Sequence, residues 1–204
     1  MTLKRPDTGA ATDAQGRRQT PSAQRNAPAI LAALQALPLH GRLMEIASGS
    51  GYHAAYIAPQ FPDLIWQPTD YDAANLASIA AWSVGISNIL PPIQMDACAP
   101  NWHLNHPNQD AILLVNLLHL VSKPKAEPLL REATLALSHS GYAIFYGPFL
   151  REGQTISAGD AKFHASLQAH DPAIGYKARA WGTCILTAQG VTLKSVGRLD
   201  ADLV

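Results

Sequence analysis

The chain has 204 residues, of which 48% are hydrophobic, and its 15 basic and 15 acidic residues give a formal net charge of zero. A chain of this length has room for one well-buried core but not for two ordinary domains. The neutral charge creates no field that would attract nucleic acid or an anionic membrane surface, so the composition favours a small-molecule partner.

The two cysteines, Cys98 and Cys184, form neither a metal-binding pair nor a disulfide framework. The N-terminus lacks the apolar segment of a signal peptide, and no apolar run approaches the roughly 20 residues that span a bilayer. We therefore expect a soluble, cytoplasmic protein, a monomer or homodimer, with no membrane or nucleic-acid partner.

Residues 1–24 contain almost no large apolar side chain, so we expect a disordered tail before a single domain over residues 25–204. From Asn26 onward, helical patterns alternate with short apolar strands, and Pro28 fits the first turn of the first helix. This alternation is typical of a parallel sheet covered by helices on both faces. The expected strands span residues 43–46, 64–67, 89–95, 111–115, 142–146 and 193–198, and the expected helices span 26–37, 52–59, 72–84, 126–137, 161–169 and 178–187.

The third expected strand contains Pro91 and Pro92, which cannot donate ladder hydrogen bonds, so this strand must lie at an edge of the sheet. A doubly wound sheet with the strand order 3-2-1-4-5-7-6 has its third strand at an edge. We therefore predict a three-layer, doubly wound, Rossmann-like α/β fold of this order, with a last strand that is short or missing. Residues 147–176 interrupt the alternation, and we expect this insertion to shape a substrate pocket or lid.

The loop after the first strand reads Glu45-Ile46-Ala47-Ser48-Gly49-Ser50-Gly51. Its glycines lack a Cβ, so the backbone can turn sharply and lie against a ligand. The dinucleotide fingerprint G-x-G-x-x-G needs a third glycine that is absent here, and the Glu45 carboxylate would repel a pyrophosphate. An acid suits a cationic ligand such as S-adenosylmethionine, beneath which class I methyltransferases place an E/D-x-G-x-G-x-G loop. An ordinary strand, turn and helix that contains two glycines is the alternative.

Polar side chains stand at or just after the ends of five successive strands, at Glu45, Asp70, Asp96, Asn116 and Tyr146. Ligands of open α/β sheets bind outside the carboxyl ends of the strands, so we expect these side chains to face one crevice. Asp70 is expected to accept both ribose hydroxyls of the cofactor, and Asp96 to accept from the adenine amine. A helix cap or a solvated turn is the alternative for each acid. The predicted cofactor-binding residues are Glu45, Ala47, Ser48, Gly49, Ser50, Gly51, His53, Asp70, Tyr71, Asp96, Ala97 and Asn116.

His119 and Tyr146, near the ends of the fourth and fifth strands, are candidates for a catalytic base or for substrate contact. A hydrogen bond within the pocket wall is the alternative for both, and packing at a helix end is the alternative for His53. His103 and His106 have the spacing of metal ligands but no third ligand nearby, so we predict a polar loop and no metal site. The predicted acceptor side of the pocket comprises Arg25, Asn26, Tyr52, Tyr146 and Phe149.

Certain segments carry a resemblance to one family, and they read Arg25-Asn26-Ala27-Pro28, Glu45-Ile46-Ala47-Ser48-Gly49-Ser50-Gly51-Tyr52-His53, Trp66-Gln67-Pro68-Thr69-Asp70, Asn116-Leu117-Leu118-His119 and Tyr146-Gly147-Pro148-Phe149. Over about residues 22–198, the chain resembles the DUF938 or UPF0585 family, the methyltransferase-like 26 proteins. The resemblance implies a class I S-adenosylmethionine-dependent methyltransferase, and it implies that Ala47 is the form that the first glycine of the loop takes in this family.

We therefore expect an enzyme that moves a methyl group from S-adenosylmethionine to an O, N or S atom of a small-molecule acceptor and releases S-adenosylhomocysteine. A non-catalytic module that binds S-adenosylmethionine or a partner protein on the same scaffold is the alternative, because a fold does not fix an activity. An oxidoreductase that uses NAD is disfavoured by Glu45 and by the missing third glycine. The protein is thus expected to bind S-adenosylmethionine and S-adenosylhomocysteine but not NAD.

Overall fold

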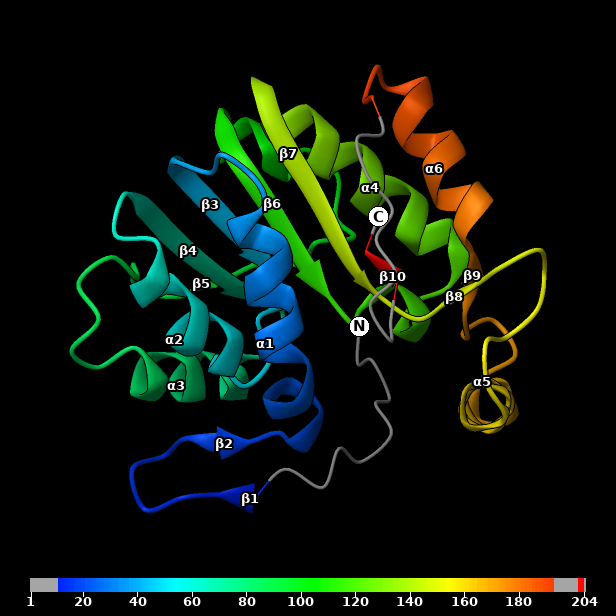
Figure 1. Ribbon diagram of the computed structural model, residues 1–204, viewed down its shortest axis with the longest axis horizontal. Coiled ribbons are helices and arrows are strands. Elements are labelled where there is room, and N and C mark those ends of the chain that lie inside the picture. The colour runs from blue at the N-terminus through cyan, green and yellow to red at the C-terminus, as the bar shows by residue number, and fades with distance from the viewer. Residues whose placement is uncertain (1–10, 193–201, 204) are drawn as a thin grey trace.

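The computed structural model describes residues 11–192 and the backbone of residues 202–203. It has three layers, with a central sheet between two layers of helices (Figure 1). The strands of the sheet are β3 (Gly41–Ile46), β4 (Leu64–Asp70), β5 (Ile93–Gln94), β6 (Gln109–Val115), β7 (Leu137–Gly147) and β10 (Asp202–Leu203), in the order β10-β7-β6-β3-β4-β5.

All neighbouring strands from β5 to β7 are parallel, whereas β10 runs antiparallel to β7. Counted from the edge strand β5, the parallel strands follow the predicted order 3-2-1-4-5, and β10 lies beside the fifth. The predicted fold class is therefore confirmed. The strand that we expected at residues 193–198 falls outside the described residues.

The third strand lies at the edge of the sheet, as its two prolines predict, but it is shorter than expected. β5 contains only two residues, and residue Ile89 makes an isolated bridge with Trp66 of β4. Pro91 and Pro92 lie between the bridge and the strand. Because a proline cannot donate to the ladder, the pairing is interrupted there.

Helices cover both faces of the sheet, and different helices cover each face (Figure 1). One hydrophobic cluster joins the sheet to α1 and α2, and the other joins it to α4 and α6. The helices are α1 (Pro21–Gln35), α2 (Tyr52–Ile57), α3 (Ala73–Trp82), α4 (Lys123–Ala136), α5 (Ala158–His170) and α6 (Arg179–Ala188), with 3-10 turns η1 (Ala58–Gln60), η2 (Trp102–Leu104) and η3 (Leu118–Leu120).

Successive residues of β3 point to opposite faces, as the two-residue period of a strand requires. Leu43 belongs to the cluster beneath α1 and α2, whereas Met44 and Ile46 belong to the cluster beneath α4 and α6. Glu45 therefore lies on the same side as Leu43, where the indole nitrogen of Trp66 donates to its carboxylate at 3.0 Å. A carboxyl group is thus buried within the apolar side of the sheet, directly before the glycine loop.

The prediction of a disordered tail is wrong for residues 11–24. The strands β1 (Ala11–Thr12) and β2 (Arg18–Gln19) form an antiparallel hairpin, and α1 begins at Pro21. Pro28 consequently lies inside α1 and not in its first turn, because Pro21 already occupies the favourable first position. The missed signal was the polar pairing around Asp13, which organises the hairpin without apolar side chains. Residues 1–10 lie outside the described residues.

The insertion predicted at residues 147–176 is present as a distinct unit beside the sheet (Figure 1). It contains β8 (Phe149–Leu150) and α5, which is longer than the predicted helix, and it ends at β9 (Lys177–Ala178), which pairs with β8 in parallel. The parallel pairing of β8 with β9 brings the two ends of the insertion together, and α5 lies in the segment between them.

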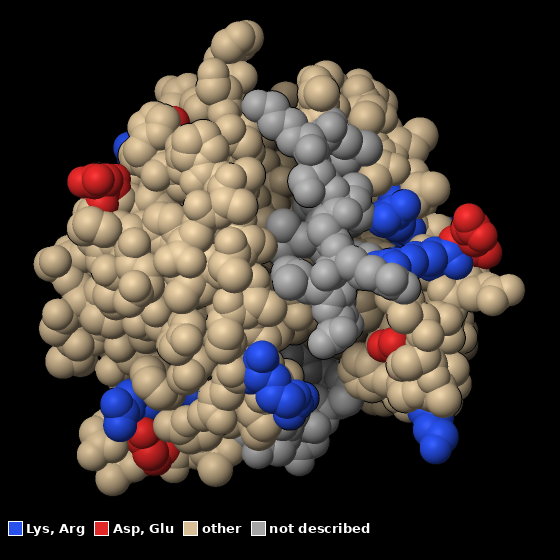
Figure 2. All heavy atoms as spheres, viewed as in Figure 1, with Lys and Arg blue, Asp and Glu red and all other residues tan. Residues whose placement is uncertain are grey.

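Charged side chains on the face shown in Figure 2 occur singly or in small mixed groups, and the described residues form no broad patch of one sign there. None of the described helices has both the length and the apolar character needed to cross a membrane.

Candidate functional site

The five strand ends that carried the predicted polar residues lie at one edge of the sheet. The registers pair Ile46 with Leu114, Thr69 with Ile93, and Val115 with Tyr146, so the parallel strands end side by side. The residues that follow them are therefore neighbours in space, as expected for the carboxyl edge of an open α/β sheet.

The glycine loop has the backbone conformation that its small residues predict. Ala47, Gly49 and Gly51 have φ angles of 56°, 60° and 88°. A Cβ on Gly51 would lie 2.6 Å from the Cα of Ile79 in α3, so this glycine is required for helix packing. A Cβ on Gly49 would meet no atom closer than the carbonyl oxygen of Ala47 at 3.9 Å, so space is open beside the loop at Gly49.

Asp70, at the end of β4, fixes this loop. Its Oδ2 accepts from the Gly49 amide at 2.8 Å, and its Oδ1 accepts from the Asp72 amide at 2.9 Å and from Asn75 Nδ2 at 3.0 Å. The residue is only 1% exposed. Asp72 caps α3 by accepting from the Ala74 amide at 3.0 Å. The Asp70 carboxylate is thus buried among the donors that it holds.

Glu45 is the other buried acid of the loop region, at 1% exposure. Its Oε2 accepts from Trp66, but no hydrogen-bond partner reaches its Oε1 within the part of the chain that the structure describes. Burial raises the pKa of this carboxyl to about 7, against the opposing effects of the Trp66 indole and the Ser48 hydroxyl, and the nearby Asp70 charge adds to the rise. A buried carboxylate oxygen without a donor is costly, so the site is suited to a ligand that supplies a donor or a positive charge.

His53 and Asn26, predicted on the cofactor and acceptor sides respectively, contact each other. The Nε2 of His53 lies 2.7 Å from Asn26 Oδ1, which can only accept, so Nε2 carries the proton. Burial lowers the pKa of His53 to about 4. The pair therefore joins the first turn of α2 to α1, while Arg25 is exposed to solvent on the neighbouring position of α1.

Asp96 is exposed after β5, and its Oδ1 accepts from the Cys98 amide at 2.9 Å. The carbonyl of Ala97 accepts from the Trp102 indole at 3.1 Å. Tyr71 is partly exposed beside Asp70. Asn116 follows β6 with a φ of 56°, and its amide donates to the Tyr146 carbonyl at 2.8 Å.

His119 lies in η3 and is 6% exposed. Burial lowers its pKa to about 4, and the Lys177 ammonium adds to this effect. Its ring packs edge-on against Phe163 of α5 and Tyr176, with centroid distances of 5.7 and 6.0 Å. Neither ring nitrogen makes a hydrogen bond with the described residues, although the side chain is almost buried.

The other two aromatic candidates are also buried. Tyr146 is 7% exposed and belongs to the cluster beneath α1 and α2, whereas Phe149 is 4% exposed and belongs to the cluster beneath α4 and α6. Tyr52, at the start of α2, stacks on Tyr56 and packs edge-on against Trp82 of α3. Tyr146 and Phe149 therefore pack in hydrophobic clusters on opposite faces of the sheet.

His103 of the H-x-x-H pair bonds to Glu132 of α4, with 2.7 Å between Nδ1 and Oε2. Among the described residues, no three histidine, cysteine or acidic side chains come close enough together to hold a metal ion.

The polar side chains that support the loop from α3 were not predicted. Asn75 and Ser78 are fully or almost fully buried, at 0% and 1% exposure, and both bond to the loop or to Asp70. Their spacing of three residues places them on one face of α3. The sequence signal that could have revealed them is the presence of two polar residues on the same helix face as the apolar Ile79.

A family model described as "Protein of unknown function (DUF938)" matches residues 17–201 of the chain. The chain belongs to the DUF938 family. The matched residues include the glycine loop, both buried acids and the insertion, so the site described above lies within the family's common region.

The fold of this DUF938 protein is similar to that of solved methyltransferases. An O-methyltransferase family protein from Burkholderia thailandensis aligns with a TM-score of 0.74 at 15% identity, over 89% of this chain and 56% of that chain. Human N-acetylserotonin methyltransferase in complex with S-adenosylmethionine aligns with a TM-score of 0.71 at 15% identity, over 89% of this chain and 51% of that chain. The DUF938 chain thus spans about half the length of these proteins. At such identities the likeness shows the Rossmann-like class I methyltransferase fold.

Proposed function

We propose that this protein is an S-adenosylmethionine-dependent methyltransferase that acts on an O, N or S atom of a small-molecule acceptor. The observation that carries the proposal is the buried Glu45 Oε1, which has no donor among the described residues and lies beside the glycine loop of a methyltransferase fold. The similar human enzyme was solved with S-adenosylmethionine, and a similar methyltransferase of calicheamicin biosynthesis was solved with S-adenosylhomocysteine.

The residues present fit this cofactor. The ammonium group of S-adenosylmethionine would supply a positively charged donor for the unpartnered Glu45 Oε1. The open space beside Gly49 would admit a ligand close to the backbone. A dinucleotide fits less well, because its pyrophosphate would meet the Glu45 carboxylate. As in the sequence prediction, we assign Asp70 to the ribose hydroxyls and Asp96 to the adenine amine. Tyr71, Ala97 and Asn116 are the further residues that we assign to the cofactor site.

S-adenosylmethionine supplies an electrophilic methyl group on a cationic sulfonium. The chain contributes alignment and exclusion of water, and well-oriented reactions of this kind reach effective molarities of about 10⁵ M or more. His119, with a pKa of about 4, is neutral at pH 7 and can accept a hydrogen bond from an acceptor hydroxyl. With this pKa, His119 is a weak base, so we expect it to orient the acceptor and not to remove its proton. The acceptor would then be a group of low pKa or would lose its proton to water. Tyr146 is the second candidate for this role.

Binding is tested by thermal unfolding of the purified protein with S-adenosylmethionine, S-adenosylhomocysteine and NAD. A ligand at 100 times its dissociation constant stabilises the native state by about 2.7 kcal/mol. We expect this stabilisation with the first two ligands and none with NAD. Stabilisation by NAD alone would refute the assignment.

Catalysis is tested separately, by following S-adenosylhomocysteine release with small-molecule hydroxyls, amines and thiols as acceptors. Turnover with one class of acceptor supports the enzyme and names the methylated atom. The small molecules that co-purify with the protein are identified by mass spectrometry and tested as acceptors as well. If S-adenosylmethionine binds but no acceptor is found and no turnover occurs, the non-catalytic binding module is favoured.

A further inference from the structure

The N-terminal hairpin of β1 and β2 is organised by one carboxylate. Asp13 Oδ1 accepts from the amides of Gln15 and Arg17 at 3.0 and 2.9 Å, and Asp13 Oδ2 accepts from Arg17 Nε at 2.9 Å. Gln19 Nε2 donates to the same oxygen at 3.2 Å. The hairpin is therefore a polar unit with its own internal bonds, and it needs no hydrophobic core.

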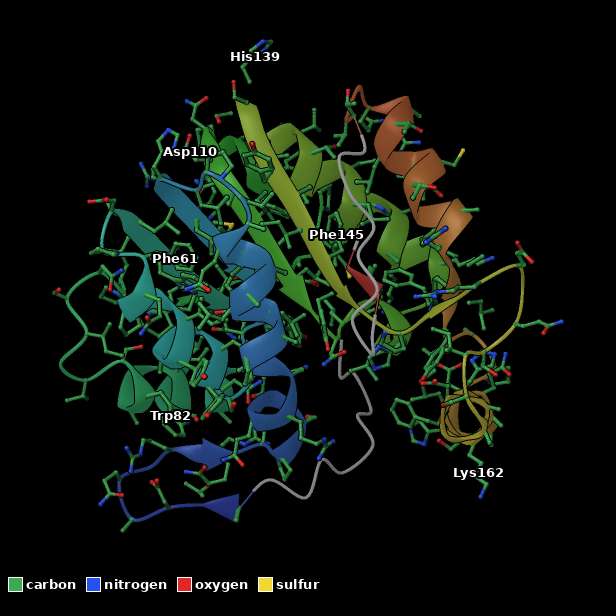
Figure 3. The ribbon with its side chains drawn as sticks, viewed as in Figure 1. Phe61, Trp82, Asp110, His139, Phe145 and Lys162 are labelled. Atoms are coloured by element: carbon green, nitrogen blue, oxygen red, sulfur yellow. The ribbon has the colours of Figure 1, made fainter. Side chains whose placement is uncertain are left out.

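The hairpin docks on α3, mainly through its backbone. The Arg18 amide donates to Ser78 Oγ at 2.9 Å, and Trp82 Nε1 donates to the Arg18 carbonyl at 3.2 Å. The Arg17 guanidinium lies 4.9 Å from the centre of the Trp82 ring, a cation–π contact. Figure 3 shows Trp82 at the end of α3 that faces the hairpin.

A first hydrogen-bond route leads from the hairpin to the glycine loop through Ser78. The Ser78 hydroxyl accepts from the Arg18 amide and donates to the Ser50 carbonyl at 2.7 Å. A hydroxyl has one donor and can do both at once. Because Ser78 is 1% exposed, water cannot replace either partner without opening the contact.

A second route passes through Asn75 and Asp70. The Arg18 guanidinium donates to Asn75 Oδ1, Asn75 Nδ2 donates to Asp70 Oδ1 at 3.0 Å, and Asp70 Oδ2 accepts from the Gly49 amide at 2.8 Å. Only one orientation of the Asn75 amide satisfies both of its bonds, so Arg18 and Asp70 together fix that orientation. Asn75 is fully buried.

A third contact is aromatic. Trp82, which holds the hairpin, packs edge-on against Tyr52 with ring centroids 5.2 Å apart. Tyr52 directly follows Gly51, so all three routes end within residues 49–52. The hairpin thus reaches the loop through side chains of α3.

We propose that the β1–β2 hairpin is a positioning element for the cofactor loop and that Arg18 is a positioning residue. The Arg18 side chain orients Asn75 and thereby Asp70 and the Gly49 amide, in the geometry that the cofactor requires. This inference rests on the proposed function for its effect on ligand binding, but its effect on the loop is independent of any ligand.

The test uses Arg18→Met in the full chain. Methionine keeps the apolar stem but removes the guanidinium, while the backbone contacts of Arg18 that dock the hairpin remain. Amide hydrogen exchange of residues 47–52 is measured without ligand, and S-adenosylhomocysteine affinity is measured by calorimetry. Loss of a charge-assisted hydrogen bond should accelerate exchange of this segment and weaken binding by about 10-fold each.

Two variants serve as controls. Arg18→Lys keeps a charged donor for Asn75, so it should retain most of the exchange protection of residues 47–52 and most of the affinity for S-adenosylhomocysteine. Arg131→Met makes the same chemical change at an exposed arginine of α4, which pairs with Glu127 at 3.2 Å, and should change neither the exchange of residues 47–52 nor the affinity. Wild-type exchange and affinity in Arg18→Met would overturn the proposal. So would faster exchange throughout the protein, which would indicate general destabilisation. If the wild-type protein binds no S-adenosylhomocysteine, the proposed function fails, and the exchange measurement alone decides the role of Arg18.

Discussion

The two buried carboxyl groups beside the glycine loop have opposite surroundings. Asp70 accepts three hydrogen bonds from the loop and from α3, whereas one oxygen of Glu45 has no donor in the described part of the chain. The difference suggests different roles. Asp70 fixes the loop in advance, while Glu45 Oε1 is available to a ligand donor, since no described residue supplies one.

The cost of burying Glu45 should be visible in the stability of the ligand-free protein. The pKa of Glu45 is raised from 4.5 to about 7, so the folded state holds a proton that the unfolded state has lost between these values. This proton contributes about 3 kcal/mol to the free energy of unfolding. The contribution is fully present below pH 4.5 and is lost as the pH rises to about 7.

Glu45→Gln should remove this pH dependence, since glutamine does not titrate. We expect the difference in unfolding free energy between the variant and the wild type to increase from pH 4.5 to pH 7 and then to stay constant, as measured by denaturant unfolding. His53 and His119 have lowered pKa values, so they stabilise the folded state as the pH rises and oppose the effect of Glu45. Their contribution is the same in both proteins and cancels in the difference. A difference that does not change with pH would show that the Glu45 carboxyl is ionised in the native protein.

Asp70 and Asp72 make a matched pair for the cofactor site. Asp70→Asn replaces a carboxylate oxygen by an amino group that cannot accept from its buried donors, so it should cost about 1–3 kcal/mol of stability and weaken S-adenosylhomocysteine binding by roughly 10-fold or more. Asp72→Asn should be nearly silent, because asparagine caps a helix about as well as aspartate.

Calorimetry and thermal unfolding of both variants would separate the two aspartates. Equal, small losses of affinity would mean that Asp70 acts only as a turn residue and that the ribose assignment is wrong.

At the scale of elements, the insertion after β7 is tied at its base. The Lys177 ammonium is 3% exposed and donates to the carbonyls of Val121 and Gly175, and burial lowers its pKa to about 8. The Gly175 amide donates to the His119 carbonyl at 2.9 Å. We therefore expect any movement on ligand binding to involve α5 and the loop before it, and not the whole of residues 147–176.

Lys177→Met should release this base. Two buried carbonyls would lose a charged donor, so we expect hydrogen exchange in residues 158–176 to accelerate by about 10-fold or more. Lys162→Met is the control, because Lys162 points into solvent from α5 (Figure 3). Unchanged exchange in Lys177→Met would show that the aromatic contacts of Tyr176 and Phe163 hold the insertion without the lysine.

Several elements were predictable because one local constraint decided them. Pro91 and Pro92 placed the third strand at the edge, and the alternation of apolar segments gave the parallel sheet. The hairpin was not predictable from hydrophobic pattern, because Asp13, Arg17 and Arg18 hold it by polar bonds with partners up to 64 residues away. Periodicity detects buried apolar faces and is blind to such bonds.

At the scale of the whole molecule, the sequence located the candidate site but not its internal contacts. The position of Glu45, Asp70 and Asn116 at one sheet edge follows from strand order. The pairing of His53 with Asn26 does not, because it depends on how α1 crosses α2. The same limit applies to Lys177, because its ammonium donates to the carbonyl of Val121, which directly follows η3 and is separated from the lysine in sequence by the whole of α4 and β7.

Calorimetric titration with S-adenosylhomocysteine at pH 6 and pH 7.5 tests the central claim, that Glu45 receives the cation of the cofactor, most directly. Glu45 must lose its proton to pair with the ligand ammonium, and a pKa of about 7 predicts binding about 8-fold tighter at pH 7.5 than at pH 6. Glu45→Gln should bind more weakly than the wild type at pH 7.5 and with little dependence on pH, and NAD should give no binding heat. Binding of NAD in place of S-adenosylhomocysteine, or equal affinity of wild type and Glu45→Gln at both pH values, would contradict the account.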